Sequence, residues 1–220
     1  MRYDAIFFDL DGTLLDTLQD ICDSMNATLA LLGHPSHPLD AYRRFVGDGI
    51  ETLASRSLPP NHRTSREVEA CVAGMRKEYG ANWNNKTRPY SGIPETLARL
   101  GEAGVTMAVL SNKPDDFTRF TVEEYFPGGL FRAAVGIGPE TPPKPDPTGA
   151  LHLVESLALA PSKTLFVGDT DMDMATALGA GMVPIGVSWG FRPAEEILAA
   201  GARRIVDHPG ELLDLVGLSS

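Results

Sequence analysis

The chain has 220 residues, of which 43% are hydrophobic and 22% charged, so it has room for one sizeable core and a small second domain. Its formal net charge of -10 argues against nucleic acid or an anionic membrane as partner, since both bind through basic surfaces. No membrane-length apolar stretch or secretory signal pattern is visible, and Cys22 and Cys71 are too far apart to suggest a metal motif, so we expect a cytoplasmic protein with reduced thiols.

The first predicted element is a strand over residues 5–8. Its unbroken run Ala-Ile-Phe-Phe suits a parallel strand that is covered on both faces. Asp9 and Asp11 follow directly. Two carboxylates so close together are costly to bury, because they repel each other and both lose hydration. A bound cation removes both penalties, so the pair predicts a magnesium-dependent phosphoryl-transfer site.

The segment that follows, residues 16–86, has helical periodicity and lacks strong strand signals. A first helix is predicted over residues 17–32, where Gly33 ends it. Further helices are predicted over about residues 38–85. Their expected interruptions are Gly47, Gly49, Pro59-Pro60 and Gly80. We therefore expect an all-helical unit over residues 16–86, inserted into an α/β core made of residues 1–15 and 87–220.

From Tyr90 onward, helices and strands alternate. The expected strands cover residues 105–110, 133–137, 164–167 and 183–187, with an edge strand at 204–206. The expected helices cover residues 94–104, 115–125 and 171–179, one that begins at Pro147 with Asp146 as its cap, and one over 193–200. Such alternation predicts an α/β fold, a doubly wound parallel sheet with helices on both faces.

Polar residues follow each of the first four predicted strands. They are Asp9 and Asp11, then Ser111-Asn112-Lys113, then Lys144, then Gly168-Asp169-Thr170-Asp171-Met172-Asp173. In open parallel sheets, ligands bind outside the carboxyl ends of the strands. The joint arrangement is hard to explain as packing and predicts one polar site at this edge.

These segments resemble the motifs of a known family. Asp-Leu-Asp-Gly-Thr-Leu at residues 9–14 resembles the first motif of the haloacid dehalogenase-like hydrolases, and the three later segments resemble the second, third and fourth motifs in the right order. The helical insert resembles the cap of the phosphoglycolate phosphatase-like branch. The resemblance implies a Rossmann-like core with strand order 5-4-1-2-3, a helical cap domain and Mg²⁺-dependent hydrolysis of a phosphomonoester.

Asp9 is the expected nucleophile, which would form an aspartyl-phosphate; the alternative is that it only binds metal. Asp11 would protonate the leaving alkoxide and then activate water, and the resemblance adds its backbone carbonyl as a metal ligand. The alternative is that Asp11 merely shapes the turn before Gly12. Gly12 would allow the backbone to approach the phosphate closely. Thr13 is expected either to bond Asp9 or to cap the turn.

Asp169 is the expected second carboxylate ligand of Mg²⁺, and Asp173 an outer or direct ligand. Asp171 is interpreted as the N-cap of the following helix, and Thr170 is assigned no role.

Ser111 and Asn112 are expected to bond phosphoryl oxygens through hydroxyl and backbone N–H groups; the alternative is a polar strand end. Lys144 lies between prolines that restrict the backbone, which favours a fixed cation between the nucleophile and the phosphate. Lys113 is either an accessory cation or a surface residue.

Substrate choice is expected to lie in the helical insert. Arg44, with backbone amides near Gly47 and Gly49, would hold the carboxylate of a small acid such as glycolate; a solvated arginine at a helix end is the alternative. The Trp189-Gly190-Phe191 segment resembles a Trp-Gly-Tyr element of phosphoglycolate phosphatases.

The sequence thus predicts a phosphatase that acts on a small anionic phosphate ester, with 2-phosphoglycolate favoured, as a monomer or homodimer. A phosphosugar mutase and an inorganic pyrophosphatase of the same fold are the alternatives. A dehalogenase would need neither Mg²⁺ nor an acid at position 11. A binding module on an inactive core would lack one of the catalytic groups.

Overall fold

The computed structural model describes residues 3–218, in which the chain forms two compact units. The α/β unit contains the residues up to Leu15 and those from Pro89 onward, and the helical unit is Asp16–Arg88. Residues 1, 2, 219 and 220, which the sequence assigns to the core, lie outside the described residues.

The α/β unit is built on a parallel sheet of six strands. They are β1 (Ala5–Phe8), β4 (Thr106–Pro114), β5 (Ala133–Ile137), β6 (Thr164–Gly168), β7 (Val183–Val187) and β8 (Arg204–Val206). Their order is β5-β4-β1-β6-β7-β8, and every neighbouring pair is parallel. Because β1 is central and the chain winds outward in both directions, the predicted doubly wound sheet is confirmed, with β8 added at the edge.

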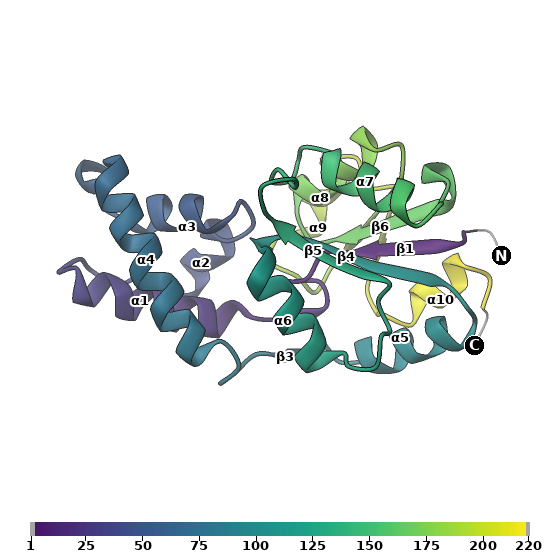
Figure 1. Cartoon of the computed structure of the whole chain (residues 1–220), viewed down its shortest axis with the longest axis horizontal. Coiled ribbons are helices and arrows are strands. Elements are labelled where there is room, and N and C mark those ends of the chain that lie inside the picture. The colour runs from purple at the N-terminus through teal and green to yellow at the C-terminus, as the bar shows by residue number, and fades with distance from the viewer. Residues whose placement is uncertain (1–2, 219–220) are drawn as a thin grey trace. The chain divides into compact units, whose positions relative to one another are not determined.

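Helices cover both faces of this sheet (Figure 1). They are α5 (Ile93–Glu102), α6 (Asp115–Tyr125), α7 (Thr148–Ser156), α8 (Asp171–Gly179), α9 (Ala194–Ala199) and α10 (Glu211–Leu215), with a 3₁₀ turn, η2, at Pro161–Lys163. Alternate side chains of β1 point to opposite faces. Ile6 and Phe8 pack with side chains of α5, α6 and α10, whereas Phe7 packs with side chains of α7 and α8. The apolar run of β1 is therefore the centre of two cores.

The helical unit consists of α1 (Leu18–Leu31), α2 (Leu39–Phe45), α3 (Ile50–Ser57), the 3₁₀ turn η1 (Pro60–His62) and α4 (Ser65–Asn82). Long helices α1 and α4 pack together, and the Cys71 thiol lies 3.6 Å from the sulfur of Met25. The predicted interruption at Gly80 is wrong, because α4 continues to Asn82. A glycine inside a helix costs only about 1 kcal/mol, which tertiary packing readily offsets.

Two short strands that the sequence did not predict lie where the chain passes from one unit to the other. β2 (Leu15–Asp16) and β3 (Arg88–Pro89) pair with each other. Within the helical unit, the buried Asp20 carboxylate accepts hydrogen bonds from the backbone N–H groups of Lys86 and Thr87 and from the Thr87 hydroxyl. This carboxylate therefore ties the beginning of α1 to the end of the helical unit.

Two boundaries differ from the prediction in ways that affect the site. β4 continues past Leu110 to Pro114 with a shift of register, so Ser111-Asn112-Lys113 lies inside the strand. α7 begins at Thr148 with Pro147 as its N-cap, so the predictions that Asp146 is the cap and Pro147 the first helical residue are wrong. The Asp146 carboxylate still accepts a hydrogen bond from the Thr148 N–H at 2.9 Å.

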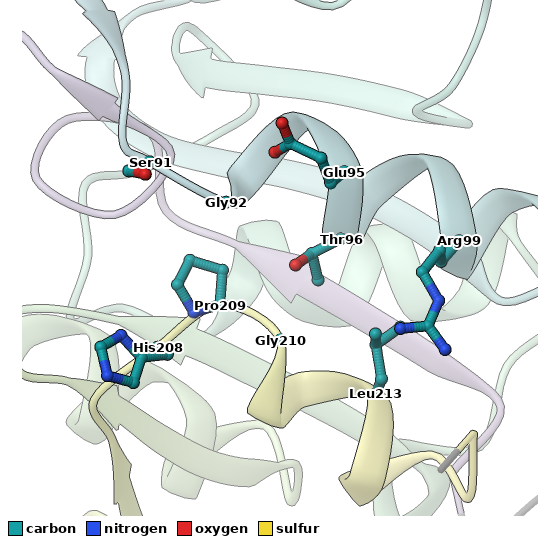
Figure 2. Close-up of a pocket in the computed structure, with 9 residues that line it drawn as sticks. All are labelled: Ser91, Gly92, Glu95, Thr96, Arg99, His208, Pro209, Gly210 and Leu213. Carbon is teal, nitrogen blue, oxygen red and sulfur yellow. The ribbon is translucent and has the colours of Figure 1, made fainter. Parts of the chain in front are cut away.

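A surface pocket of about 350 Å³ lies between the beginnings of α5 and α10 (Figure 2). Thr96, Arg99 and His208 are among its lining residues, and none of the predicted site residues is. Among the described residues, no helix is both long and apolar enough to cross a membrane.

The two-core arrangement predicts a strong contrast between leucines of the α/β unit. Leu97 of α5 is fully buried, whereas Leu198 of α9 is 50% exposed. Leu97→Ala should destabilise the protein by about 3 kcal/mol, because it leaves a cavity under the sheet. In thermal unfolding, this corresponds to a fall in Tm of roughly 6–12 °C. Leu198→Ala, which removes the same atoms, should change Tm by only about a degree; equal losses would contradict the assignment of the core.

Candidate active site

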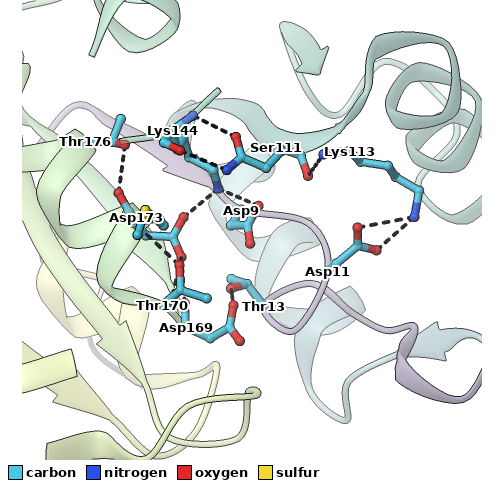
Figure 3. Close-up of polar contacts among 12 residues, drawn as sticks. Asp9, Asp11, Thr13, Ser111, Lys113, Lys144, Asp169, Thr170, Asp173 and Thr176 are labelled. Atoms are coloured by element: carbon cyan, nitrogen blue, oxygen red, sulfur yellow. Dashed lines mark hydrogen bonds and ion pairs between the residues drawn. The ribbon is translucent and has the colours of Figure 1, made fainter. Parts of the chain in front are cut away.

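The carboxyl ends of β1, β4 and β6 bring the predicted polar residues to one edge of the sheet (Figure 3). Asp9 follows β1 directly, and its backbone N–H donates to the carbonyl of Val167 in β6 at 2.9 Å. This bond extends the β1–β6 pairing by one residue and holds Asp9 beside Asp169. Both residues are buried: Asp9 is 7% exposed and Asp169 is 0% exposed.

Lys144 is the cation of this cluster. Its Nζ donates to Asp9 Oδ1 at 2.8 Å and to Asp173 Oδ1 at 2.6 Å, and only 3% of its side chain is exposed. The ammonium also lies 5.7 Å from the centre of the Phe166 ring. A lysine in such surroundings is held by its carboxylates and is not a solvated loop residue.

Asn112 holds the backbone of Lys144, which the sequence did not predict. Its amide Nδ2 donates to the Lys144 carbonyl at 3.1 Å, and its Oδ1 accepts from the Lys144 N–H at 2.7 Å. Both backbone groups are buried, so the amide supplies partners that water cannot. The side chain of Asn112 thus fixes Lys144, while Ser111 Oγ accepts a hydrogen bond from the Lys113 N–H at 3.2 Å.

Asp169 is held by two segments that are distant in the chain. Its Oδ1 accepts from the Thr13 hydroxyl at 3.2 Å, and its Oδ2 accepts from the Phe191 N–H at 2.7 Å. A side chain at Gly12, whose φ is +91°, or at Gly190 would collide with Asp169. Gly12 therefore makes room for this carboxylate.

These contacts correct the expectation for the Thr13 side chain, because its hydroxyl donates to Asp169 and not to Asp9 or to the turn. They also give a role to the Trp-Gly-Phe segment after β7, which the sequence singled out only as a resemblance. Trp189 Nε1 donates to the Thr13 carbonyl at 3.0 Å. The segment therefore supports both the loop after β1 and Asp169.

The N-cap of α8 is Thr170, so the assignment of this role to Asp171 is wrong. Thr170 has an extended backbone and its hydroxyl accepts from the Asp173 N–H at 3.4 Å, whereas Asp171 is already helical. Asp173 Oδ2 completes the capping box by accepting from the backbone N–H groups of Asp169 and Thr170 and from the Thr170 hydroxyl. Both oxygens of Asp173 are thus engaged, one by the cap and one by Lys144.

Asp11 points to Lys113, on the side of the loop away from Lys144 (Figure 3). Lys113 Nζ lies 3.0 Å from Asp11 Oδ1 and 3.2 Å from Oδ2. Since Lys113 is only 8% exposed, the alternative that it is a surface residue is wrong.

Burial governs the charges at this edge. It raises the pKa of Asp9 from 3.8 to about 7, although Lys144 acts in the opposite direction. Burial, together with Asp9 and Asp173, raises the pKa of Asp169 well above its usual range. For Lys144, burial lowers the pKa, but the carboxylates of Asp173 and Asp9 outweigh it and the net pKa is raised.

The cluster fits a divalent cation. Oxygens of Asp9, Asp169 and Asp173 lie within 4.8 Å of one another. Within residues 3–218, these three carboxylates form the group of side chains that could hold a metal ion. When ionised, the three carboxylates outweigh the Lys144 ammonium by two negative charges. A hard dication with a preference for oxygen ligands would balance that excess.

Arg44 lies in the helical unit, exposed on α2. The loop between α2 and α3 that follows it is held by Arg56, whose Nη1 donates to the carbonyls of Arg44 and Phe45 at 3.2 Å each and pairs with Asp48. The loop that contains Gly47 and Gly49 therefore has a fixed form within its own unit.

The raised carboxylate pKa values predict that metal binding stabilises the protein more strongly at high pH. Asp9 contributes stability below about pH 4 that is lost as the pH rises through about 7, because its charged form is buried. Saturating Mg²⁺ should restore it and raise Tm by roughly 5–10 °C at about pH 8, and by much less at about pH 5.5. Differential scanning fluorimetry with Mg²⁺ or EDTA measures this. Asp169→Asn should abolish the shift, and a shift that is independent of pH would contradict the prediction.

Comparison with known proteins agrees with this geometry. The family described as haloacid dehalogenase-like hydrolase matches residues 6–187. The chain is 30% identical to a phosphoglycolate phosphatase of Vibrio parahaemolyticus, over 98% of this chain and 96% of that one. It is 34% identical to an N-acetylmuramic acid 6-phosphate phosphatase of Pseudomonas aeruginosa, again over 98% and 96% of the two chains.

Among solved structures, a predicted phosphoglycolate phosphatase from Haemophilus somnus is 27% identical and superposes with a TM-score of 0.91, covering 98% of this chain and 99% of that one. The resemblance seen in the motifs is therefore confirmed by the whole chain. The protein belongs to the haloacid dehalogenase-like hydrolases, in their phosphoglycolate phosphatase-like branch, and is a phosphoric monoester hydrolase.

Proposed function

We propose that this protein is a cytoplasmic, Mg²⁺-dependent phosphatase that works through an aspartyl-phosphate. The observation that carries the proposal is the buried cluster of Asp9, Asp169 and Asp173 around Lys144, whose excess negative charge calls for a dication. The two buried cysteines, both free thiols, support a reducing compartment.

Asp9 attacks phosphorus, and the bond to the leaving oxygen breaks as the new bond forms. Lys144, which touches Asp9 at 2.8 Å, balances charge on the nucleophile and on the phosphoryl oxygens. Gly12, the Ser111 hydroxyl and the Asn112 N–H bind those oxygens. Asp11 gives a proton to the leaving oxygen. In the second step it takes a proton from a water whose oxygen attacks phosphorus, and the bond between Asp9 and phosphorus breaks to release inorganic phosphate.

Asp9 and Asp169 would hold Mg²⁺ together with the backbone carbonyl of Asp11. When bound, the ion neutralises charge on the carboxylates and on the phosphate. Asp173, whose oxygens accept bonds from Lys144 and from the start of α8, acts from the second layer by fixing the cation and the strand end.

The favoured substrate is 2-phosphoglycolate, because phosphatases named for it are similar over nearly the whole chain. N-acetylmuramic acid 6-phosphate is the second candidate, since a phosphatase of that name is 34% identical. Both molecules carry a carboxylate in addition to the phosphate ester. Arg44, with the amides near Gly47 and Gly49, would hold that carboxylate.

The mutase and pyrophosphatase alternatives use the same core and differ in product. Release of inorganic phosphate with a free alcohol indicates a phosphomonoesterase, an isomerised sugar phosphate indicates a mutase, and turnover of pyrophosphate alone indicates a pyrophosphatase. A screen of small phosphate esters with and without Mg²⁺ separates the three.

Asp9→Asn should lower Mg²⁺-dependent phosphate release by about 10⁴-fold or more, since the nucleophile is lost. Acid-quenched wild-type protein should show a phosphoryl adduct by intact mass spectrometry, and the variant should not. Asp171→Asn, which removes a carboxylate from the helix start without touching the cluster, serves as the control and should retain activity. Turnover that survives in Asp9→Asn would exclude Asp9 as nucleophile.

Arg44→Ala should lower kcat/KM for 2-phosphoglycolate by about tenfold or more, because a charged hydrogen bond to the carboxylate is lost. Ethyl phosphate, which has no carboxylate, should be affected far less. The neighbouring Arg43, which pairs with Asp40 at 3.5 Å, provides the matched variant Arg43→Ala. If kcat/KM for 2-phosphoglycolate is unchanged in Arg44→Ala, this residue does not select the substrate.

A further inference from the structure

Lys113 is a buried cation for which the proposed chemistry so far provides no task. Its side chain is 5% exposed, and its ammonium lies within 3.2 Å of both oxygens of Asp11, whose side chain is 13% exposed. The two residues are separated by 102 positions and come from the end of β4 and the loop after β1. Such a pair forms only when the two segments reach their final places.

The shape of the strand end explains how neighbouring residues serve different carboxylates. Successive side chains of a strand point in opposite directions. Asn112 contacts the backbone of Lys144. The Lys113 ammonium instead contacts the carboxylate of Asp11 (Figure 3). Lys144 and Lys113 are therefore not interchangeable, because one faces the nucleophile and the other faces the acid.

Contact with both carboxylate oxygens restricts how Asp11 can turn. Burying an ammonium is costly unless it is paired, so Lys113 keeps its place by keeping the pair. Without it, Asp11 would sit at the rim of the site with more than one accessible rotamer. Proton transfer needs the carboxyl group within hydrogen-bond reach of the leaving oxygen, and small displacements are expensive.

We propose that Lys113 is a positioning residue for Asp11, which it holds at the edge of the site through both carboxylate oxygens so that the acid can reach the leaving group. This inference rests on the proposed role of Asp11 as general acid. The segment Ser111-Asn112-Lys113 would then have two tasks, which are to bind phosphate and to orient Asp11.

Leaving groups of different basicity test the role. The alkoxide released from 2-phosphoglycolate needs a proton as the P–O bond breaks, whereas p-nitrophenolate is stable without one. Lys113→Met should lower kcat for 2-phosphoglycolate by about 10²-fold while KM changes little, and should lower kcat for p-nitrophenyl phosphate by less than about tenfold. Lys113→Arg, which retains a cation, should recover part of the loss. Lys77→Met, which removes an exposed lysine of α4, is the control and should behave as wild type.

A double-mutant cycle tests the role of Lys113 separately from the proposed role of Asp11 as general acid. Asp11→Asn should show the same dependence on the leaving group, and adding Lys113→Met to it should cause little further loss, because the two residues act together. Suppose that Asp11→Asn lowers kcat mainly for 2-phosphoglycolate, but Lys113→Met lowers kcat equally for both esters or lowers it further in the double variant. The inference about Lys113 is then wrong, while the proposed role of Asp11 as general acid stands. If Asp11→Asn slows both esters equally, Asp11 is not the acid and both fail. Should Lys113→Met not fold, Lys113→Gln, which also removes the cation, gives the same comparison.

Discussion

The structure depends on one electrostatic constraint, which is that three carboxylates and one ammonium are buried together where β1 and β6 end. Burial and the repulsion between neighbouring carboxylates disfavour the ionised forms of Asp9 and Asp169, and the pKa values of both are raised accordingly. Lys144 offsets one charge, and its raised pKa shows that the site strongly favours its charged form. The composition of the buried cluster thus suits a divalent cation, which we propose to be Mg²⁺.

The contacts around this cluster use hydrogen-bond donors that the fold already provides. The first N–H groups of α8 need partners, and Asp173 supplies one while its other oxygen holds Lys144. The Asn112 side chain accepts a hydrogen bond from the backbone N–H of Lys144. In the loop after β7, the Phe191 N–H donates a hydrogen bond to the Asp169 carboxylate. In the proposed mechanism, Lys144 and Asp169 are therefore held in place by neighbouring residues, which would limit the reorganisation needed during catalysis.

The two units are assigned different parts of the proposed function, which are the chemistry and the choice of substrate. The α/β unit contains the groups to which we assign nucleophilic attack, charge neutralisation and proton transfer. The helical unit has a separate core between α1 and α4, and a loop held by Arg56 that follows Arg44. The proposed chemistry can thus be argued from the α/β unit, whereas the proposed choice of substrate depends on Arg44 in the helical unit.

Local pattern was enough to predict a parallel sheet, most helices and the polar residues at the strand ends, whereas the strand order was implied by the family resemblance. An apolar run such as Ala5–Phe8 and the alternation of helices and strands after Tyr90 are properties of short segments, and turn and strand-end residues follow from them. The orientation of the side chains was decided by tertiary structure. Thr13 bonds Asp169 across 156 positions, and Asp11 meets Lys113 across 102. No local period encodes such pairs, because a side chain turns toward the partner that the complete fold brings within reach. The sequence by itself therefore determined which groups the site contains, and the packing of β1, β4, β6 and the loop after β7 decided which of them act together.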